Sequence, residues 1–124
     1  MRTLFGIMVA GGLGAAARYG VDGVVSQHLP GGFPWGTLVV NITASVLLGL
    51  VFTLTTERIA LDAHERLALT TGFIGSYSTF STLMLESARL AGSGAYALAM
   101  VNLGGSVVLG MIAVTAGIFI GKAL

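Results

Sequence analysis

The sequence predicts an all-α integral membrane protein with four transmembrane helices in a single domain, residues 1–124, and three observations support this. Hydrophobic residues make up 55% of the chain and charged residues 9%, against about 25% charged residues in soluble domains. Four apolar stretches each come close to the roughly 20 residues that a helix needs to cross a bilayer. The connections between them are short, which leaves no room for a second domain.

The four expected spans are separated by three connections. The spans cover residues 3–25, 36–56, 67–90 and 95–120. The first connection, 28–34, holds both prolines and should turn the chain, with Trp35 anchored at the membrane interface. The second, 57–66, must lie in water because it carries five of the eleven Asp, Glu, Lys and Arg residues. The third, 91–94, is so short that the flanking helices should be antiparallel neighbours.

The composition argues against several classes of protein. The absence of cysteine excludes disulfides, thiolate metal sites and cysteine nucleophiles. The net charge is only +1 and neither sign forms a block, so a nucleic-acid partner is not expected. His28 and His64 both fall in expected loops, which gives an enzyme little support. Arg2 and the small residues 15–17 resemble a secretory signal, but three more spans follow, so we expect this segment to be retained.

Two short motifs match known patterns but lie in a context that does not suit the usual function of those patterns. Residues 12–17 fit the dinucleotide pattern G-x-G-x-x-A, but no strand precedes them and no acidic residue follows at the required distance. Residues 41–43 fit a glycosylation sequon, but they lie inside the second expected span. Close helix packing explains the first motif better, and the second must have another role.

Polar and small residues recur every three or four positions in the second and last spans. The two sets are Thr37, Asn41, Ser45 and Gly49, and Asn102, Ser106, Gly110, Ala113, Gly117 and Gly121. This spacing places each set along one face of a helix. We expect the glycines and Ala113 to allow close helix packing. For Asn41 and Asn102 two readings stay open: a hydrogen bond between helices, or N–H donors offered to a permeating anion.

The third span contains a run of hydroxyl side chains. Six of the seven residues 76–82 carry a hydroxyl, and Phe80 is the exception. Such side chains compete for backbone hydrogen bonds, and Gly72 and Gly75 lie just upstream, so we predict a break in this helix. A break within a membrane is tolerated only where it is buried or lines a water-filled path. Freed carbonyls would suit a cation and hydroxyls an anion. The alternative is a continuous helix with hydroxyls bonded to preceding carbonyls.

Arg18 lies deep in the first span. An arginine at such a depth usually faces the interior of a helix bundle or a vestibule, because exposure to lipid is costly. The alternative is that Arg18 reaches to the membrane interface and pairs with Asp22, which follows one helical turn later.

Four segments, in this order along the chain, resemble the Fluc family of fluoride channels, also called CrcB. They are residues 11–19, 33–41, 72–75 with 78–82, and 102–106. The resemblance implies a channel subunit in the cell membrane that exports fluoride passively. It also implies an antiparallel dimer with two fluoride pathways along its interfaces. A structural sodium ion would lie at the centre, held by the backbone carbonyls of Gly75 and Ser78.

The resemblance also assigns side chains to the fluoride pathway. Asn41 and Phe80 would line it, with the aromatic ring offering its positive edge to the anion. Weaker candidates are Thr82, Asn102 and Ser106, and Arg18 would correspond to the arginine of the family's vestibule.

The chain departs from the family pattern at three positions. Ser76 stands where a second glycine is usual, and Ser78 replaces a threonine, which matters little if the backbone carbonyl is the ligand. Leu83 stands where a second aromatic is common. An aliphatic side chain has no ring quadrupole, which leaves open whether one of the two aromatic stations in each pathway is missing.

Two other functions compete with a channel. A small multidrug-resistance-type exporter is also an antiparallel four-helix dimer, but proton coupling needs a carboxylate in the middle of its first helix. This chain has only Asp22, near the end of that span. A structural membrane subunit without transport would show neither a break nor a central ion.

The distribution of basic residues bears on the dimer. Arg2, Arg58, Arg66 and Lys122 should lie on the side of the N-terminus and Arg89 on the other, with Arg18 set aside. This bias favours a cytoplasmic N-terminus. A chain with one fixed orientation cannot supply its own antiparallel partner. We therefore hypothesise a heterodimer with an oppositely biased paralogue, which could also provide the aromatic lacking at Leu83. The alternative is a homodimer of chains inserted both ways.

Overall fold

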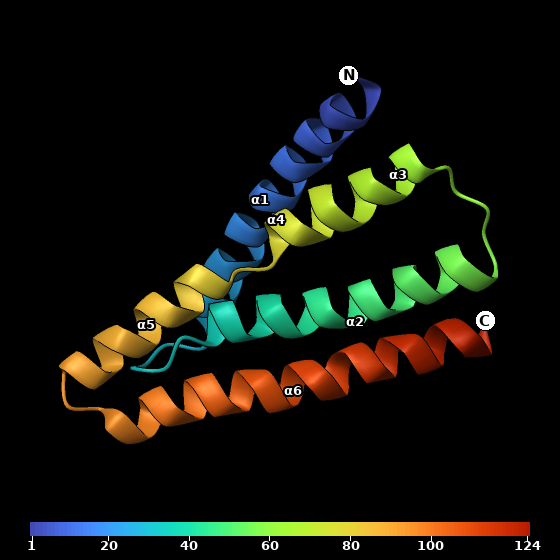
Figure 1. Ribbon diagram of the computed structural model, residues 1–124. Coiled ribbons are helices and arrows are strands. Elements are labelled where there is room, and N and C mark those ends of the chain that lie inside the picture. The colour runs from blue at the N-terminus through green and yellow to red at the C-terminus, as the bar shows by residue number, and fades with distance from the viewer.

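The computed structural model describes all 124 residues, and every regular element is helical (Figure 1). The elements are α1 (Arg2–His28), α2 (Trp35–Glu57), α3 (Ala63–Leu67), the π-helical segment η1 (Ala68–Ile74), α4 (Gly75–Tyr77), α5 (Phe80–Gly92) and α6 (Tyr96–Ala123). Three of them, α1, α2 and α6, are long and apolar enough to cross a membrane. The chain is a multi-pass membrane protein.

The long helices follow the predicted spans closely. Each begins and ends within three residues of the predicted limits. The third expected span, 67–90, is instead divided among α3, η1, α4 and α5. The predicted loop 57–66 is too long at both ends: α2 continues to Glu57, and α3 already begins at Ala63.

The early start of α3 has a local cause. The Asp62 carboxylate accepts a hydrogen bond from the Glu65 N–H at 2.8 Å, and the Glu65 carboxylate accepts one from the Asp62 N–H at 3.2 Å. This reciprocal pair is a capping box. Arg2 at the start of α1 pairs with Asp62 at 3.3 Å, and the Thr3 hydroxyl bonds to the His64 ring. The starts of α1 and α3 are therefore joined.

The helices form two groups that meet at the broken third helix (Figure 1). Helices α2 and α6 lie side by side and run in the same direction, and α5 packs on α6 as its antiparallel neighbour, as the short connection predicted. Helix α1 packs along η1 and α4, and it also contacts α2. The first half of the third helix therefore contacts α1, and the second half contacts α6.

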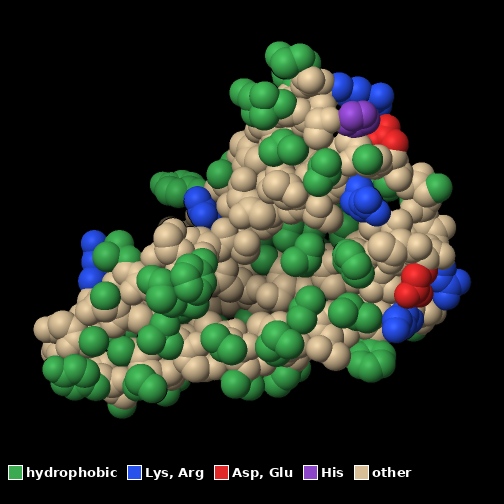
Figure 2. All heavy atoms as spheres, in the orientation of Figure 1, with side chains coloured by type: hydrophobic (Ala, Val, Ile, Leu, Met, Phe, Trp, Pro, Cys, Tyr) green, Lys and Arg blue, Asp and Glu red, His purple; other side chains and the backbone are tan.

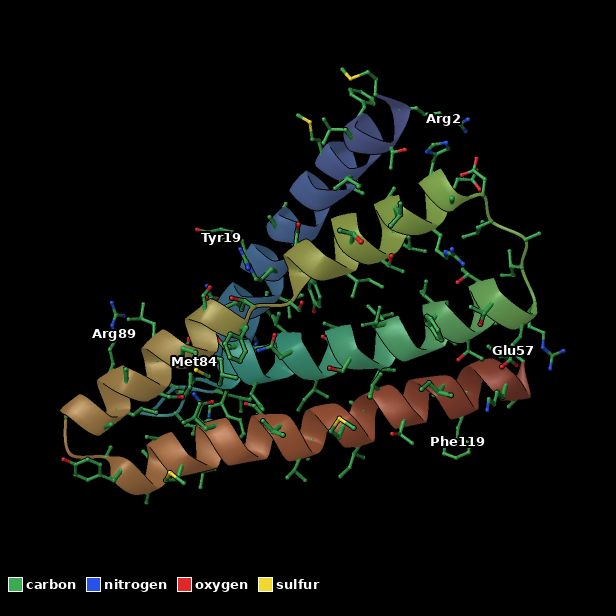
Figure 3. The ribbon with its side chains drawn as sticks, in the orientation of Figure 1. Arg2, Tyr19, Glu57, Met84, Arg89 and Phe119 are labelled. Atoms are coloured by element: carbon green, nitrogen blue, oxygen red, sulfur yellow. The ribbon has the colours of Figure 1, made fainter.

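The outer surface agrees with a membrane environment. On the face shown in Figure 2, hydrophobic side chains are spread along the helices, whereas most charged groups gather at the end where α3 begins and α2 and α6 finish. Arg2 and Glu57 lie at this end and Arg89 lies at the opposite one (Figure 3). The basic residues are thus separated as the sequence suggested.

Glycine allows the closest helix contacts. A Cβ added at Gly49 would fall on the carbonyl oxygen of Val114, and one added at Gly117 would fall on that of Val46. The backbones of α2 and α6 therefore touch, which confirms the packing role predicted for these two glycines. Gly14 of α1 approaches the Phe73 carbonyl of η1 in the same way.

Replacing either glycine of the α2–α6 contact should separate the two helices. We expect Gly49→Ala and Gly117→Ala each to lower the free energy of unfolding by about 1–3 kcal/mol, the usual cost of overpacking. Gly104→Ala is the control, because nothing lies within 4 Å of a Cβ at that position of α6. Denaturant unfolding in detergent measures the effect, and equal stabilities of all three variants would contradict the close contact.

The capping box predicts a dependence of stability on pH. The Glu65 N–H, and in the same direction the Arg2 guanidinium, hold the pKa of the Asp62 carboxyl below its usual range. A lowered pKa adds stability above the unfolded-state value of about 3.9, and this is lost as the pH falls through the folded-state value. Asp62→Ala should therefore lower the melting temperature at neutral pH and less so in acid.

Asp62→Asn separates the cap from the charge. Asparagine can still cap the helix but cannot ionise, so its melting temperature should lie between those of the wild type and Asp62→Ala at neutral pH. An Asp62→Ala deficit of the same size at both pH values would show that the charge has no role.

Candidate functional site

The third helix is broken at two residues. Helix α4 ends at Tyr77 and α5 begins at Phe80, and between them Ser78 (φ −74°, ψ 160°) and Thr79 (φ −151°, ψ 112°) are extended. The predicted break is confirmed, and the alternative of a continuous helix is wrong. Because the break lies between apolar helices, its polar peptide groups need partners other than lipid.

A single side chain of α2 bonds to the break. Asn41 Oδ1 accepts the Thr79 N–H at 2.8 Å, and Asn41 Nδ2 donates to the Thr79 carbonyl at 3.0 Å. The amide therefore pairs with both peptide groups of Thr79, as a neighbouring strand would. The Thr79 hydroxyl in turn accepts the Thr82 N–H at 3.3 Å and caps the start of α5.

The carbonyls of Gly75 and Ser78 are among those that the break leaves without helical donors. In a continuous helix the Gly75 carbonyl would accept the Thr79 N–H, and the Ser78 carbonyl would accept the Thr82 N–H. Here the Thr79 N–H goes to Asn41, and the Thr82 N–H goes to the Thr79 hydroxyl. The Gly75 carbonyl keeps only a long bond of 3.5 Å from the Ser78 hydroxyl. The two residues predicted to hold a cation thus both present freed oxygens.

A hollow of about 260 Å³ opens beside the break. Its lining includes three of the five predicted pathway residues, Asn41, Phe80 and Ser106, together with Ser45, Ser78, Thr79, Leu83 and Val107. The Ser106 hydroxyl oxygen is buried and has no hydrogen-bond partner. The Phe80 side chain is 74% exposed, whereas Leu83 is 6% exposed and packs within its own chain.

The other two predicted pathway residues lie elsewhere. Asn102 is fully buried, and its Nδ2 donates at 2.9 Å to the hydroxyl of Ser87 on α5. This geometry favours the first of its two readings, a hydrogen bond between helices, although its Oδ1 has no partner. Thr82 lines a different hollow, on the side of α5 that faces α1.

This second hollow contains Arg18. Its volume is about 330 Å³, and it is lined by Ala15, Arg18, Tyr19, Asp22, Thr37, Val40, Thr79 and Thr82. Arg18 is half-buried there. The alternative pairing with Asp22 does not form, since the one ion pair of the chain joins Arg2 to Asp62. Tyr19, which lines this hollow, projects outward from α1 (Figure 3).

Glu86 of α5 was not predicted from the sequence as a functional residue. The Thr37 hydroxyl donates to Glu86 Oε1 at 2.7 Å, while Glu86 Oε2 is buried and has no partner. A carboxylate inside an expected span is a functional candidate by default, so a usable signal was present. Glu86 also lines a third hollow, of about 320 Å³, with Arg89 and residues 31–34. Because Thr37 lines the hollow of Arg18, the Thr37–Glu86 bond lies between two hollows.

Known proteins place the chain in a family. The family model for CrcB-like protein, Camphor Resistance (CrcB), matches residues 5–118. The chain belongs to the CrcB family. Its relatives include the fluoride-specific ion channel FluC of Solidesulfovibrio magneticus, 42% identical over 95% of this chain and 94% of that protein. The FluC of Maridesulfovibrio salexigens is 38% identical with the same coverage, and FluC 2 of Mycobacterium tuberculosis is 43% identical over 94% of this chain and 89% of its own length.

The Thr37–Glu86 bond in this CrcB protein can be tested by two replacements. Thr37→Val keeps the shape of the side chain but leaves both Glu86 oxygens without a donor. It should lower the free energy of unfolding by about 1–3 kcal/mol, the cost of a buried unsatisfied group. Thr37→Ser keeps the hydroxyl and should remain close to the wild type. Chemical unfolding in detergent compares them, and a serine variant as unstable as the valine variant would exclude the bond as the cause.

Proposed function

We propose that this CrcB protein is a subunit of a channel through which fluoride leaves the cell passively, and that it is not an enzyme. The observation that carries the proposal is the hollow beside the helix break, lined by Asn41, Phe80 and Ser106. It occurs in a chain whose relatives, over almost their whole length, are named fluoride-specific ion channels. A proton-coupled exporter gains no support, because α1 offers only Asp22 near its end.

The chemistry of the hollow suits a small anion. Fluoride must replace the water that it loses with hydrogen-bond donors, and neutral donors do so without trapping it. Asn41 Nδ2 carries two N–H groups and donates one to Thr79, so the other is available. The Ser106 hydroxyl has no partner, and the Phe80 ring can offer its positive edge. We assign these three residues to the fluoride pathway.

Arg18 suits the entrance of this pathway. Its positive charge in the second hollow would raise the local concentration of anions. Thr82 lines the same hollow and is a candidate contact for an entering ion. Asn102 is sealed between α5 and α6, so a place in the pathway would require these helices to move.

The break suits a structural sodium ion. Small hard cations take oxygen ligands, including backbone carbonyls, and Gly75 and Ser78 present two carbonyls without helical donors. An antiparallel partner chain would bring its own two carbonyls to the same ion. The ion would supply fixed positive charge between the chains, while the residues of this chain would hold the carbonyls in position.

The dimer and the four spans belong to the same proposal. The broken helix would cross the bilayer in two halves, as the third of four spans. Phe80 is 74% exposed, and we assign its free face to a partner chain that closes the pathway. The partner is an antiparallel copy of this chain or an oppositely oriented paralogue.

Fluoride transport tests the function directly. Liposomes that contain only this polypeptide should release fluoride without a proton gradient and release chloride poorly, as measured with ion-selective electrodes. Equal rates for both anions, or dependence on a proton gradient, would reject a selective channel. If the channel requires a paralogue, these liposomes would release fluoride only after the paralogue is added to them.

The ring of Phe80 should matter more than its bulk. Phe80→Ile removes the ring edge but keeps an apolar side chain, and we expect fluoride flux to fall about tenfold or more, the effect of about 1.4 kcal/mol on a barrier. Phe119→Ile is the matched control, because that ring projects away from α6 far from the break (Figure 3). Near-normal flux in a properly assembled Phe80→Ile dimer would remove Phe80 from the pathway.

The orientation of the chain decides between the two partners. Single cysteines near residues 60 and 92 lie in the connections at opposite ends of the helices. In cells that express only this chain, a fixed orientation predicts labelling of one site from outside. Equal labelling of both sites, with fluoride transport, would defeat the paralogue hypothesis.

A further inference from the structure

We infer that Asn41 is a positioning residue that holds the helix break open, so that sodium binding at Gly75 and Ser78 depends on the Asn41 amide. The inference rests on the proposed function, because the cation belongs to that proposal. It goes beyond a pathway role for Asn41: the same side chain that lines the fluoride hollow also determines whether the cation carbonyls are free.

Two acceptors compete for one hydrogen atom at the break. The Thr79 N–H has two potential acceptors, the Gly75 carbonyl in a continuous helix and Asn41 Oδ1 in the broken one. In the structure it donates to Asn41 at 2.8 Å. Without the amide, the Gly75 carbonyl would be the nearest partner available within the same helix. Loss of Asn41 therefore favours closure of the break and occupation of the carbonyl that the cation needs.

The helix that carries Asn41 is held firmly by its neighbours. Asn41 stands on α2, which touches α6 through Gly49 and Gly117. The same helix also holds the residues on either side of the break, since the Thr43 and Tyr77 hydroxyls bond at 2.8 Å and Thr37 bonds to Glu86 at 2.7 Å. Among the side chains of α2, only Asn41 bonds to the break itself. It therefore fixes the extended residues Ser78 and Thr79 to a closely packed helix.

Asn41 also connects the proposed sodium site to the fluoride hollow. Asn41 Nδ2 uses one N–H for the Thr79 carbonyl, and its second N–H is free for an anion in the hollow that Asn41 lines. Fluoride bound to the second N–H would hold the Asn41 amide in the orientation that leaves the Gly75 carbonyl free for sodium. Sodium at the break would in turn favour the orientation in which this N–H faces the hollow. Such coupling is reciprocal, so fluoride should increase the apparent sodium affinity and sodium the apparent fluoride affinity.

The test measures sodium-dependent thermal stability rather than transport. The purified full-length protein in detergent is titrated with sodium, with N-methyl-D-glucamine as the replacement cation at constant ionic strength. A ligand that binds only the folded state raises the melting temperature with its concentration. For Asn41→Leu we expect the sodium concentration for half of this effect to rise about tenfold or more, within the usual range of coupling between sites.

Asn102→Leu is the matched control, because it makes the same replacement at an asparagine that bonds between two other helices, α6 and α5. It removes the bond to Ser87 and should lower the melting temperature in all conditions while leaving the sodium dependence as in the wild type. If Asn41→Leu does not fold, Asn41→Gln serves instead, because its longer side chain cannot meet both groups of Thr79 from the same position.

The outcomes separate the inference from the proposed function. Sodium dependence lost in the Asn41 variant but kept in Asn102→Leu supports the inference, even if the wild type fails to pass fluoride. Equal sodium dependence in the wild type and the Asn41 variant overturns it, even if the wild type is a good fluoride channel. A wild type that sodium does not stabilise also overturns it.

Discussion

A helix that is interrupted inside a membrane must find new partners for its peptide groups, because lipid offers none. In this CrcB protein the third helix is broken among apolar helices, and the amide of Asn41 bonds to both the N–H and the carbonyl of Thr79. The arrangement of the other helices supports this contact. Glycine contacts press α2 against α6, α1 packs on the first half of the broken helix, and α6 packs on the second half. The candidate site is thus a consequence of how the peptide groups at one helix break find hydrogen-bond partners.

Much of the fold could be predicted from the sequence because span length and hydropathy are local properties. The limits of α1, α2 and α6 follow from apolar runs, and the break follows from hydroxyl groups that compete for backbone bonds. The start of α3 was missed although its signal was present, since Asp62 and Glu65 have the spacing of a capping box. The π-helical form of η1 was not predicted from the sequence.

The candidate site was less predictable for a physical reason. Helical periodicity assigns faces only within an unbroken helix, and two extended residues reset the phase of α5 relative to α4. The resemblance named Asn41, Phe80 and Ser106 as pathway residues, and all three line one hollow. Counting residues could not place Thr82 in the hollow of Arg18, or Glu86 in the third hollow with Arg89. Asn102 shows a second limit of prediction from the sequence. An asparagine that bonds between two helices and one that lines an ion path both lie in the same pattern of polar residues every fourth position.

The break is a defined part of the fold, in which the Thr79 N–H donates to Asn41 rather than to the Gly75 carbonyl. Infrared spectroscopy of the reconstituted protein, with a heavy-isotope label placed at that single carbonyl, measures this most directly. The control carries the label at Gly104, within the uninterrupted α6. A carbonyl without a helical donor vibrates at a higher frequency, so the Gly75 band should lie above the Gly104 band and shift when sodium is replaced. Coincident bands that do not respond to the cation would contradict the account.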